Sequence, residues 1–296
     1  MILIGHRGSV EIRLNPASRL GETRLPGGRR LAWSEWGPQR GVPVLLCPGA
    51  AQSRGLGFGT DVVDELGVRL ISVDRPGLGA SDPAPGRTLL DWADDIAALT
   101  AERGCERFSV VGYSTGAPFA LACAAQGLVA SAAVVAGGDE MPRFVEDLPP
   151  HARETVRSAM ADPARAEEFF GGFGDVDALW ELILSGSSEH DRAVYTQPAF
   201  EAALRRSMAE GLAQGTAGYA RDTALVMQSW PFAAEDIAVP VDLWYGEHDE
   251  SPVHSPDLGA TLAARIPGAT RHLLPDAGGS VLWTHAGAIL RSLLRR

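Results

Sequence analysis

The sequence predicts an α/β fold in which a mostly parallel sheet is covered by helices on both faces. Apolar runs of strand length, such as Val42–Cys47 and Val68–Val73, alternate with helical segments along most of the chain. Strands with apolar runs of this kind are typical of parallel sheets that are buried on both faces. One long stretch, residues 139–230, has helical patches and no convincing strand, so it is expected to be an insertion.

Bulk composition limits the classes of function. The chain has 296 residues, of which 45% are hydrophobic and 21% charged, as in a soluble globular domain. All 26 basic residues are arginine, which excludes catalytic-lysine chemistry. A net charge of −11 without a basic cluster argues against nucleic acid or anionic membranes as partners. We therefore expect a small-molecule substrate and a monomer or homodimer.

The N-terminus and the cysteines bear on location. The first residues contain no apolar run of signal-peptide length, and no run approaches a membrane span. The three cysteines are an odd number, which favours reduced thiols and a cytoplasmic protein. Cys47, at the end of an apolar run, is interpreted as a buried thiol.

The N-terminal part predicts a hairpin, two strands and a helix. Residues 1–20 have little pattern and are expected to be an extension. A Pro-Gly-Gly turn separates residues 22–25 from Arg30–Trp36, which indicates a hairpin. The strands Val42–Cys47 and Val68–Val73 follow. An amphipathic helix is then indicated by apolar residues at spacings of three and four, from Leu89 to Leu99.

The C-terminal part repeats the alternation around the insertion. A strand is expected at 132–136, and helical patches fall at 152–160, 177–184 and 200–213. The alternation resumes with a strand at 241–245, a helix at 256–265, the strand Thr270–Leu274 and a closing helix at 280–294. The predicted domains are a core of residues 21–138 and 231–296 and a helical lid of residues 139–230 over the top of the sheet.

The segment around Ser114 carries the strongest chemical signal. Gly112-Tyr113-Ser114-Thr115-Gly116 has the pattern G-x-S-x-G, with an apolar strand before it and a small-residue helix after it. That context is the one a nucleophile elbow requires. The turn is so sharp that the serine takes a strained backbone conformation and only glycine fits at either flank. Ser114 is therefore the candidate nucleophile.

Two further motifs support a family resemblance. Residues 74–82 read DRPGLGASD, and residues 244–249 read WYGEHD and are followed by Pro252-Val253. With the elbow and the inserted helices, these motifs resemble the α/β-hydrolase family over most of residues 21–296. Members with a single helical lid, of the proline-iminopeptidase and epoxide-hydrolase type, are the most similar. The resemblance implies an α/β-hydrolase fold.

The resemblance also implies roles for individual residues. In the order Ser, Asp, His, Asp249 is the acid that orients the histidine, and Asp139 is the alternative. The oxyanion hole would use the backbone amides of Ala50 and Thr115. The family commonly has His-Gly in the loop before Ala50, where this chain has Pro48-Gly49. Backbone amides remain donors after this exchange.

The expected histidine is missing from its family position. The resemblance places it after the last strand, where Gly279 stands. His248 and His254 lie beside Asp249, and either could swing towards Ser114, but each is more simply an ordinary loop or surface histidine. Loss of the base from a serine triad costs about 10⁶-fold in turnover.

Three explanations stay open at this point. The histidine was replaced by Gly279 through engineering, or a base comes from elsewhere in the fold or from the substrate. Alternatively, the fold serves chemistry that needs a shaped pocket and oxyanion donors but no activated nucleophile.

Aromatic side chains suggest the character of the substrate. Tyr113 lies beside the nucleophile, and Trp180 and Trp230 are candidate pocket walls together with Phe169, Phe170, Phe173 and Phe232. Such a lining favours a small, largely apolar carbonyl compound. Dinucleotide, phosphate-loop and metal-ligand motifs are missing, so we expect no cofactor and no metal.

The leading functional hypothesis is hydrolysis of an ester, lactone or amide through Ser114. A second is a non-hydrolytic enzyme on the same fold that carries out a cyclisation, elimination or decarboxylation. A third is a catalytically silent ligand-binding protein, which would bind its ligand without turnover.

Overall fold

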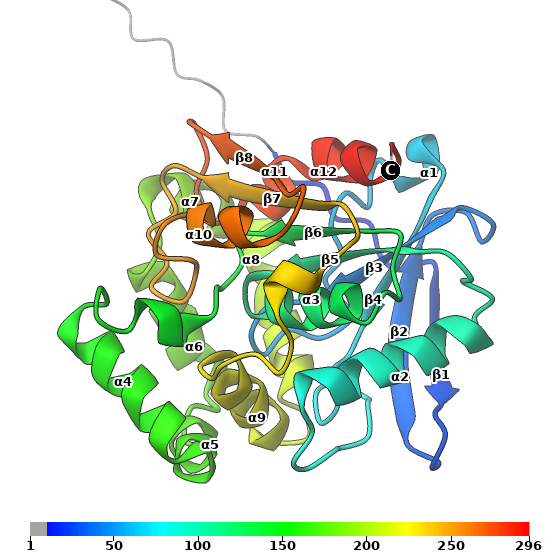
Figure 1. Ribbon diagram of the computed structural model, residues 1–296. Helices are drawn as coiled ribbons and strands as arrows, with labels where there is room; N and C mark the ends of the chain where they lie inside the picture. The colour runs from blue at the N-terminus through cyan, green and yellow to red at the C-terminus, as the bar shows by residue number, and fades with distance from the viewer. Residues whose placement is uncertain (1–10, 296) are drawn as a thin grey trace, which may run out of the picture.

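The fold is built on one eight-stranded sheet. A computed structural model describes residues 11–295. The strand order is β1-β2-β4-β3-β5-β6-β7-β8, seen in Figure 1. The strands are β1 (Arg19–Arg24), β2 (Arg30–Trp36), β3 (Val42–Cys47), β4 (Val68–Val73), β5 (Ser109–Tyr113), β6 (Ser131–Val135), β7 (Val241–Gly246) and β8 (Thr270–Leu274). The predicted α/β class is confirmed.

Strand direction explains where a site can form. Strand β2 pairs antiparallel with β1 and with β4, and every pairing from β4 to β8 is parallel. The carboxyl ends of the six parallel strands therefore meet at one edge of the sheet. Ligands of open α/β sheets bind outside this edge.

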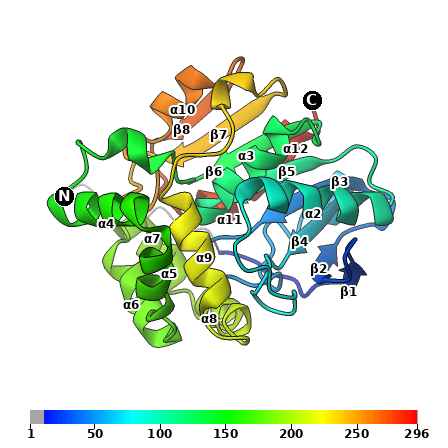
Figure 2. The same ribbon diagram turned by 60° about the horizontal axis from the view of Figure 1, so that its bottom comes forward.

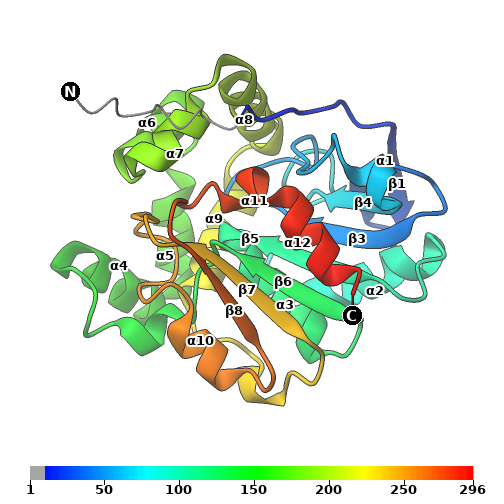
Figure 3. The ribbon, with the colours of Figure 1, turned by 90° about the horizontal axis from the view of Figure 1, so that it is seen from above.

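Helices cover both faces, as the apolar strands predict. Val110 and Val111 are adjacent on β5 but belong to two different core clusters, because successive side chains point to opposite faces. One cluster packs under α2 (Leu89–Glu102), α3 (Ala117–Ala125) and α10 (Ala260–Arg265). The other packs under α1 (Val63–Leu66), α11 (Val281–Thr284) and α12 (Ala286–Leu293). Figure 3 shows α11 and α12 lying over the strands.

Six helices lie between β6 and β7, and we refer to them as the insertion. They are α4 (Pro150–Ala161), α5 (Pro163–Gly171), α6 (Val176–Ser185), α7 (Glu189–Tyr195), α8 (Pro198–Gly211) and α9 (Ala217–Val226). Figure 2 shows them gathered on one side of the molecule. All six fall within the predicted stretch 139–230, and a lid role for that stretch stays a prediction. The sequence interpretation missed α5, α7 and α9.

Several predicted boundaries were wrong by a few residues. The helix expected at 256–265 begins only at Ala260, because Gly259 has the left-handed φ of 77° and Asp257 accepts hydrogen bonds from the amides of Ala260 and Thr261. The closing helix is split into α11 and α12 at His285, whose φ of −122° is not helical.

The N-terminal segment is anchored where it is described. The predicted extension was residues 1–20, of which residues 1–10 lie outside the described part. Within the rest, the Asn15 amide donates to Thr60 Oγ1 at 2.7 Å, and the carbonyl of Asn15 accepts from Trp36 Nε1 at 2.9 Å. The last two residues of this range, Arg19 and Leu20, already belong to β1. None of the helices within residues 11–295 has the length and apolar character needed to cross a membrane.

Candidate active site

The elbow has the geometry that its sequence predicts. Ser114 follows β5 directly, begins a short 3₁₀ turn (Ser114–Gly116) and has a φ of 50°. A Cβ on Gly116 would lie 2.0 Å from the carbonyl oxygen of Cys47, and one on Gly112 would lie 2.6 Å from Cα of Ala117. Both glycines are therefore required, and the strained serine is confirmed.

His254 is the histidine that meets the elbow. Its Nε2 accepts a hydrogen bond from Ser114 Oγ at 2.9 Å. Its Nδ1 lies 2.9 Å from Oδ1 and 2.7 Å from Oδ2 of Asp249, which fixes the proton on Nδ1 and leaves Nε2 as the acceptor. The imidazole is buried. The interpretation of His254 as an ordinary loop or surface histidine was wrong.

Backbone hydrogen bonds fix the loop that carries Asp249 and His254. The loop leaves β7 and is tied to the segment after β8, since the amides of Glu247 and His248 donate to the carbonyls of Leu274 and Ala277 at 2.9 and 3.0 Å. Beyond His254, the Ser255 amide donates to the carbonyl of Gly137 at 2.9 Å, in the segment after β6. The loop is thereby held between its two neighbours at the carboxyl edge.

Gly279 makes room for this arrangement. A Cβ at this position would lie 3.0 Å from Asp249 Oδ1 and 3.0 Å from His254 Cε1. The expectation that Gly279 leaves the base position vacant is corrected, because the imidazole of His254 already fills the space beside it.

The insertion holds the segment that contains Gly279. Asp191 on α7 is buried and accepts hydrogen bonds from the amides of Gly279 at 2.9 Å and Ser280 at 2.7 Å. A Cβ on Gly278 would lie 2.3 Å from Asp191 Oδ2. The first glycine of the Gly278-Gly279 pair thus admits Asp191, and the second admits His254.

No other histidine within residues 11–295 has a described hydrogen bond with Ser114, although His151 on α4 lines the cavity beside it. His248 is exposed and stacks on His190, with ring centroids 4.1 Å apart. His272 Nε2 lies 3.3 Å from Asp242 Oδ1 on the neighbouring strand β7. His285 caps α12, and burial lowers the pKa of its imidazole. His6 lies outside the described residues.

The loop after β3 lies against the elbow. Among the described backbone hydrogen bonds of turns and loops, none uses the amide of Ala50 or of Thr115 as donor. Cys47, just before this loop, is fully buried, and burial raises the pKa of its thiol to about 12. The interpretation of Cys47 as a buried strand-end thiol is therefore confirmed, and its thiol stays protonated at neutral pH.

A cavity of about 580 Å³ opens beside Ser114. Its walls come from the loops after β3, β5, β6 and β7 and from the insertion, and they include Tyr113 and the cluster of Phe169, Phe170 and Phe173. Trp180 and Trp230 are not among the described lining residues, so their predicted place in the pocket wall was wrong. Trp180 is buried and belongs to the core cluster that packs under α1, α11 and α12, and Trp230 stacks on Phe232.

The polar lining has an acidic character. No arginine lines the cavity within residues 11–295, whereas Asp139 and Asp191 do. Asp139 is buried, its Oδ1 accepts a hydrogen bond from the amide of Glu140 at 2.6 Å, and its Oδ2 has no partner among the described residues. Burial raises the pKa of Asp139 to about 6. No group of three or more His, Cys, Asp or Glu side chains in the described chain is placed to hold a metal ion.

Asp139 was the alternative orienting acid, and the described contacts do not bring it to the histidine. The two contacts of His254 Nδ1 are both to Asp249.

Comparison with known proteins places these features in context. The sequence model of the alpha/beta hydrolase family matches residues 44–291. A non-heme chloroperoxidase of Streptomyces lividans is 32% identical over 100 residues, which are 33% of this chain and 36% of that protein. The match thus spans only about a third of the relative's length.

Solved structures share the fold over nearly the whole chain. A thermophilic esterase from Thermogutta terrifontis has a TM-score of 0.70 at 23% identity, covering 94% of this chain and 97% of its own. The enol-lactonase from Burkholderia xenovorans LB400 has a TM-score of 0.68 at 18% identity, covering 93% and 98%. At these identities the likeness concerns the fold alone.

Proposed function

Because the chain belongs to the alpha/beta hydrolase family, we propose that it is a serine hydrolase of neutral, largely apolar esters or lactones. The observation that carries this proposal is the 2.9 Å contact between His254 Nε2 and Ser114 Oγ, with Asp249 on the other ring nitrogen. A serine in this contact can lose its proton to the imidazole as it attacks a carbonyl.

The steps follow from the positions of these groups. Ser114 Oγ attacks the substrate carbonyl carbon and His254 Nε2 takes the proton. Asp249 stabilises the imidazolium that results. The oxyanion of the tetrahedral intermediate accepts hydrogen bonds from the backbone amides of Ala50 and Thr115. His254 then returns the proton to the leaving alkoxide, and an acyl group remains on Ser114.

Deacylation repeats the same steps with water. His254 Nε2 takes a proton from a water molecule, whose oxygen attacks the acyl carbonyl. Collapse of the second tetrahedral intermediate releases the carboxylic acid, and Ser114 regains its proton from the imidazolium. No group beyond those already named is needed.

The cavity supports the proposed substrate class. The lining of the cavity is mostly apolar and includes the phenylalanine cluster and aliphatic side chains of the insertion, which suits an apolar acyl or alcohol group. Asp139 and Asp191 are the charged groups in its described lining, and an anionic substrate would meet no arginine there. The esterase and the enol-lactonase among the structurally similar proteins agree with ester or lactone hydrolysis.

Active-site labelling tests the proposal. A fluorophosphonate should add one adduct at Ser114, detected by intact mass, and Ser114→Ala should abolish both the adduct and the hydrolysis of p-nitrophenyl butyrate. Ser109→Ala on the preceding strand is the matched control, since Ser109 bonds to Ser131 and does not line the cavity. Retained turnover in Ser114→Ala would favour a non-hydrolytic enzyme. Ligand binding without any labelling or turnover would favour a silent binding protein.

A pair of substrates tests the charge preference. Neutral p-nitrophenyl butyrate should be hydrolysed well, and the mono-p-nitrophenyl ester of succinate, which carries a carboxylate, should be hydrolysed poorly. Equal rates for the two esters would contradict the assignment of neutral substrates.

A further inference from the structure

Arg75 is buried behind the loop that carries the Ala50 amide. It follows β4, in the segment that reads DRPGLGASD, and its side chain has no exposed surface. Nη1 donates to the carbonyl of Pro48 at 2.5 Å and Nη2 donates to the carbonyl of Gly49 at 2.9 Å. One planar guanidinium therefore holds two consecutive carbonyls of this loop.

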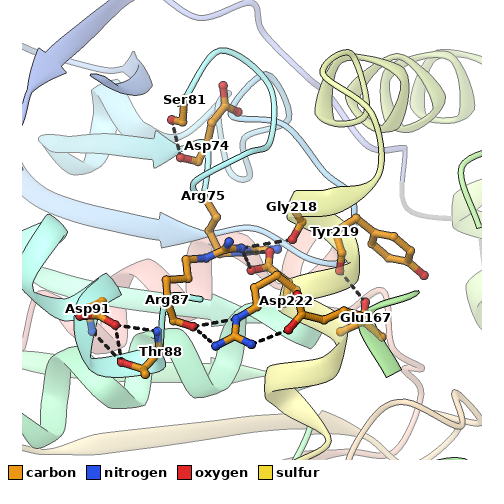
Figure 4. Close-up of polar contacts among 12 residues, drawn as sticks. Asp74, Arg75, Ser81, Arg87, Thr88, Asp91, Glu167, Gly218, Tyr219 and Asp222 are labelled. Carbon is orange, nitrogen blue, oxygen red and sulfur yellow. Dashed lines mark hydrogen bonds and ion pairs between the residues drawn. The ribbon is translucent and has the colours of Figure 1, made fainter. Parts of the chain in front are cut away.

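The third side of the guanidinium is fixed by the insertion. Arg75 Nε donates to Oδ2 of Asp222 on α9 at 2.6 Å, and Figure 4 shows Arg75 directed at this helix. Asp222 is buried and also pairs with Arg87, which donates to the carbonyl of Gly218 as well. A Cβ on Gly218 would lie 2.5 Å from the backbone of Gly77, so α9 packs directly on the loop after β4.

Peptide geometry links Arg75 to the oxyanion site. No peptide bond in the described chain is cis, so the carbonyl of Gly49 and the N–H of Ala50 point in opposite directions within their shared peptide plane. With the carbonyl held by Arg75, the N–H is turned away from the guanidinium. A charged donor on the carbonyl also polarises the amide and strengthens its N–H as a donor.

From these contacts we infer that Arg75 is a positioning residue for the oxyanion hole. It orients and polarises the Ala50 amide without touching the substrate. Arg87 pairs with the same carboxylate of Asp222 but has no described contact with the loop after β3. The inference rests on the proposed function, because it assigns the Ala50 amide to the oxyanion.

The two arginines provide a matched pair of variants. Arg75→Met leaves Arg87 paired with Asp222, and Arg87→Met leaves Arg75 paired with Asp222. Each variant thus removes one buried cation and retains one ion pair with the same carboxylate. Only Arg75→Met removes the bonds to Pro48 and Gly49.

The kinetic effect should separate the two. Removal of one oxyanion donor typically costs 10²- to 10³-fold in kcat, and a misdirected amide should cost about 10- to 100-fold. Arg75→Met should show this loss in kcat for p-nitrophenyl butyrate with KM nearly unchanged. Its affinity for a trifluoromethyl ketone, which forms an oxyanion on Ser114, should fall in proportion. Arg87→Met should keep kcat and inhibitor affinity within a few-fold of the wild type.

Arg75→Lys keeps the test decisive should Arg75→Met fail to fold. Lysine keeps the charge but cannot hold two carbonyls with a planar fork, so kcat should fall while the thermal unfolding temperature stays close to that of the wild type. Equal losses in the Arg75 and Arg87 variants, or full kcat in a folded Arg75→Lys protein, would overturn the inference. Failure of the proposed function is distinct, since the wild-type protein itself would then neither label nor hydrolyse.

Discussion

The loops after β7 and β8 are neighbours at the same edge of the sheet, and they differ in which one carries the histidine that contacts Ser114. The resemblance to the hydrolase family places the histidine after β8, where this chain has Gly278-Gly279. The loop after β7 carries both Asp249 and His254, and the imidazole reaches Ser114 from there. The imidazole that the sequence lacks at position 279 is thus supplied by His254, from the loop after the adjacent strand.

His254 can take this place because backbone hydrogen bonds connect the loop after β7 to the segment after β8. The amides of Glu247 and His248 donate to carbonyls of the segment after β8, so the β7 loop starts against the chain that would have carried the histidine. Gly279 then offers a backbone without a side chain to the imidazole of His254. In this chain, the imidazole that contacts Ser114 comes from the loop after β7, and the loop after β8 supplies only backbone beside it.

Replacement of His254 should have the largest effect. In His254→Ala the proton acceptor for Ser114 is lost, and kcat for p-nitrophenyl butyrate should fall by about 10⁶-fold. Stopped-flow absorbance would measure the rate of the wild type, and absorbance followed over long times would measure the rate of His254→Ala. His272→Ala is the control, since His272 also pairs with an aspartate but lies on β8 away from Ser114. A His254→Ala protein that still labels with fluorophosphonate at the wild-type rate would show that His254 is not the proton acceptor of Ser114.

A double variant sharpens the same point. Without the ring of His254, a side chain at position 279 has the space that the ring occupied. His254→Ala/Gly279→His should therefore recover part of the lost rate, by returning the imidazole to the β8 loop. No recovery would mean that the β8 backbone in this chain no longer directs a side chain at Ser114.

The sequence predicts the sheet well because its strands are defined by local composition. Arg30–Trp36, Val42–Cys47, Val68–Val73 and Thr270–Leu274 have the predicted bounds, since each is an apolar or alternating run between turn residues. The elbow is also defined locally. Gly112 and Gly116 are needed because a side chain at either position would clash, and Ser114 between them has a positive φ. The strained turn at Ser114 could therefore be predicted without a structure.

The partner of Ser114 is a tertiary feature that local patterns do not contain. His254 lies 140 residues from Ser114, and its position depends on hydrogen bonds between loops of β6, β7 and β8. The available signal was the combination of a histidine five residues after Asp249 with a glycine pair after β8.

Pocket walls were predicted less well for the same reason. Trp180 and Trp230 were chosen for their type, but the face a helix turns to the cavity depends on its packing. The phenylalanine cluster does line the cavity, and two of its members, Phe169 and Phe170, lie on α5, a helix that the sequence interpretation missed.

A methyl group at Gly279 should give an intermediate effect. The backbone of Gly279 has no positive φ, so Gly279→Ala introduces crowding without backbone strain. The Cβ would press on Asp249 and His254 at 3.0 Å and shift the imidazole from Ser114. We expect kcat to fall by about 10- to 100-fold, because small misplacements of reacting groups have effects of this size.

The control for this variant is Gly171→Ala in α5, where the nearest atom to a Cβ would be Thr216 Oγ1 at 3.8 Å. Steady-state kinetics of both proteins would measure the difference. An unchanged kcat in Gly279→Ala would show that a Cβ at position 279 does not displace the imidazole of His254, and that a glycine is not needed there.

The smallest effect on catalysis is expected at Asp139, which extends the comparison to the loop after β6. Since Asp249 makes both carboxylate contacts with His254, Asp139→Asn should keep kcat at pH 8 within a few-fold of the wild type. A loss near 10⁴-fold, typical of an orienting aspartate, would instead assign that role to Asp139.

The stability of Asp139→Asn should depend on pH. The pKa of Asp139 is raised from 3.8 to about 6, mainly by burial and also by the charges of Asp257 and Glu140, while the hydrogen bond from the Glu140 amide and the charge of Arg265 lower it. Its Oδ2 has no partner in the described chain. Above pH 6 the folded wild type must hold a buried carboxylate, whereas below pH 3.8 the side chain is protonated in both the folded and unfolded states. Asp139 therefore contributes to the free energy of unfolding of the wild type at low pH, and this contribution is lost as the pH rises through about 6.

Asparagine keeps the acceptor for the Glu140 amide and carries no charge at any of these pH values. Relative to the wild type, its free energy of unfolding should therefore rise by up to about 3 kcal/mol between pH 4 and pH 7.5, the amount that a pKa rise from 3.8 to about 6 represents. Urea unfolding of both proteins at the two pH values would measure it. A difference that does not change with pH would mean that Asp139 ionises in the fold as it does in water, and that the cavity beside Ser114 is better solvated than its lining implies.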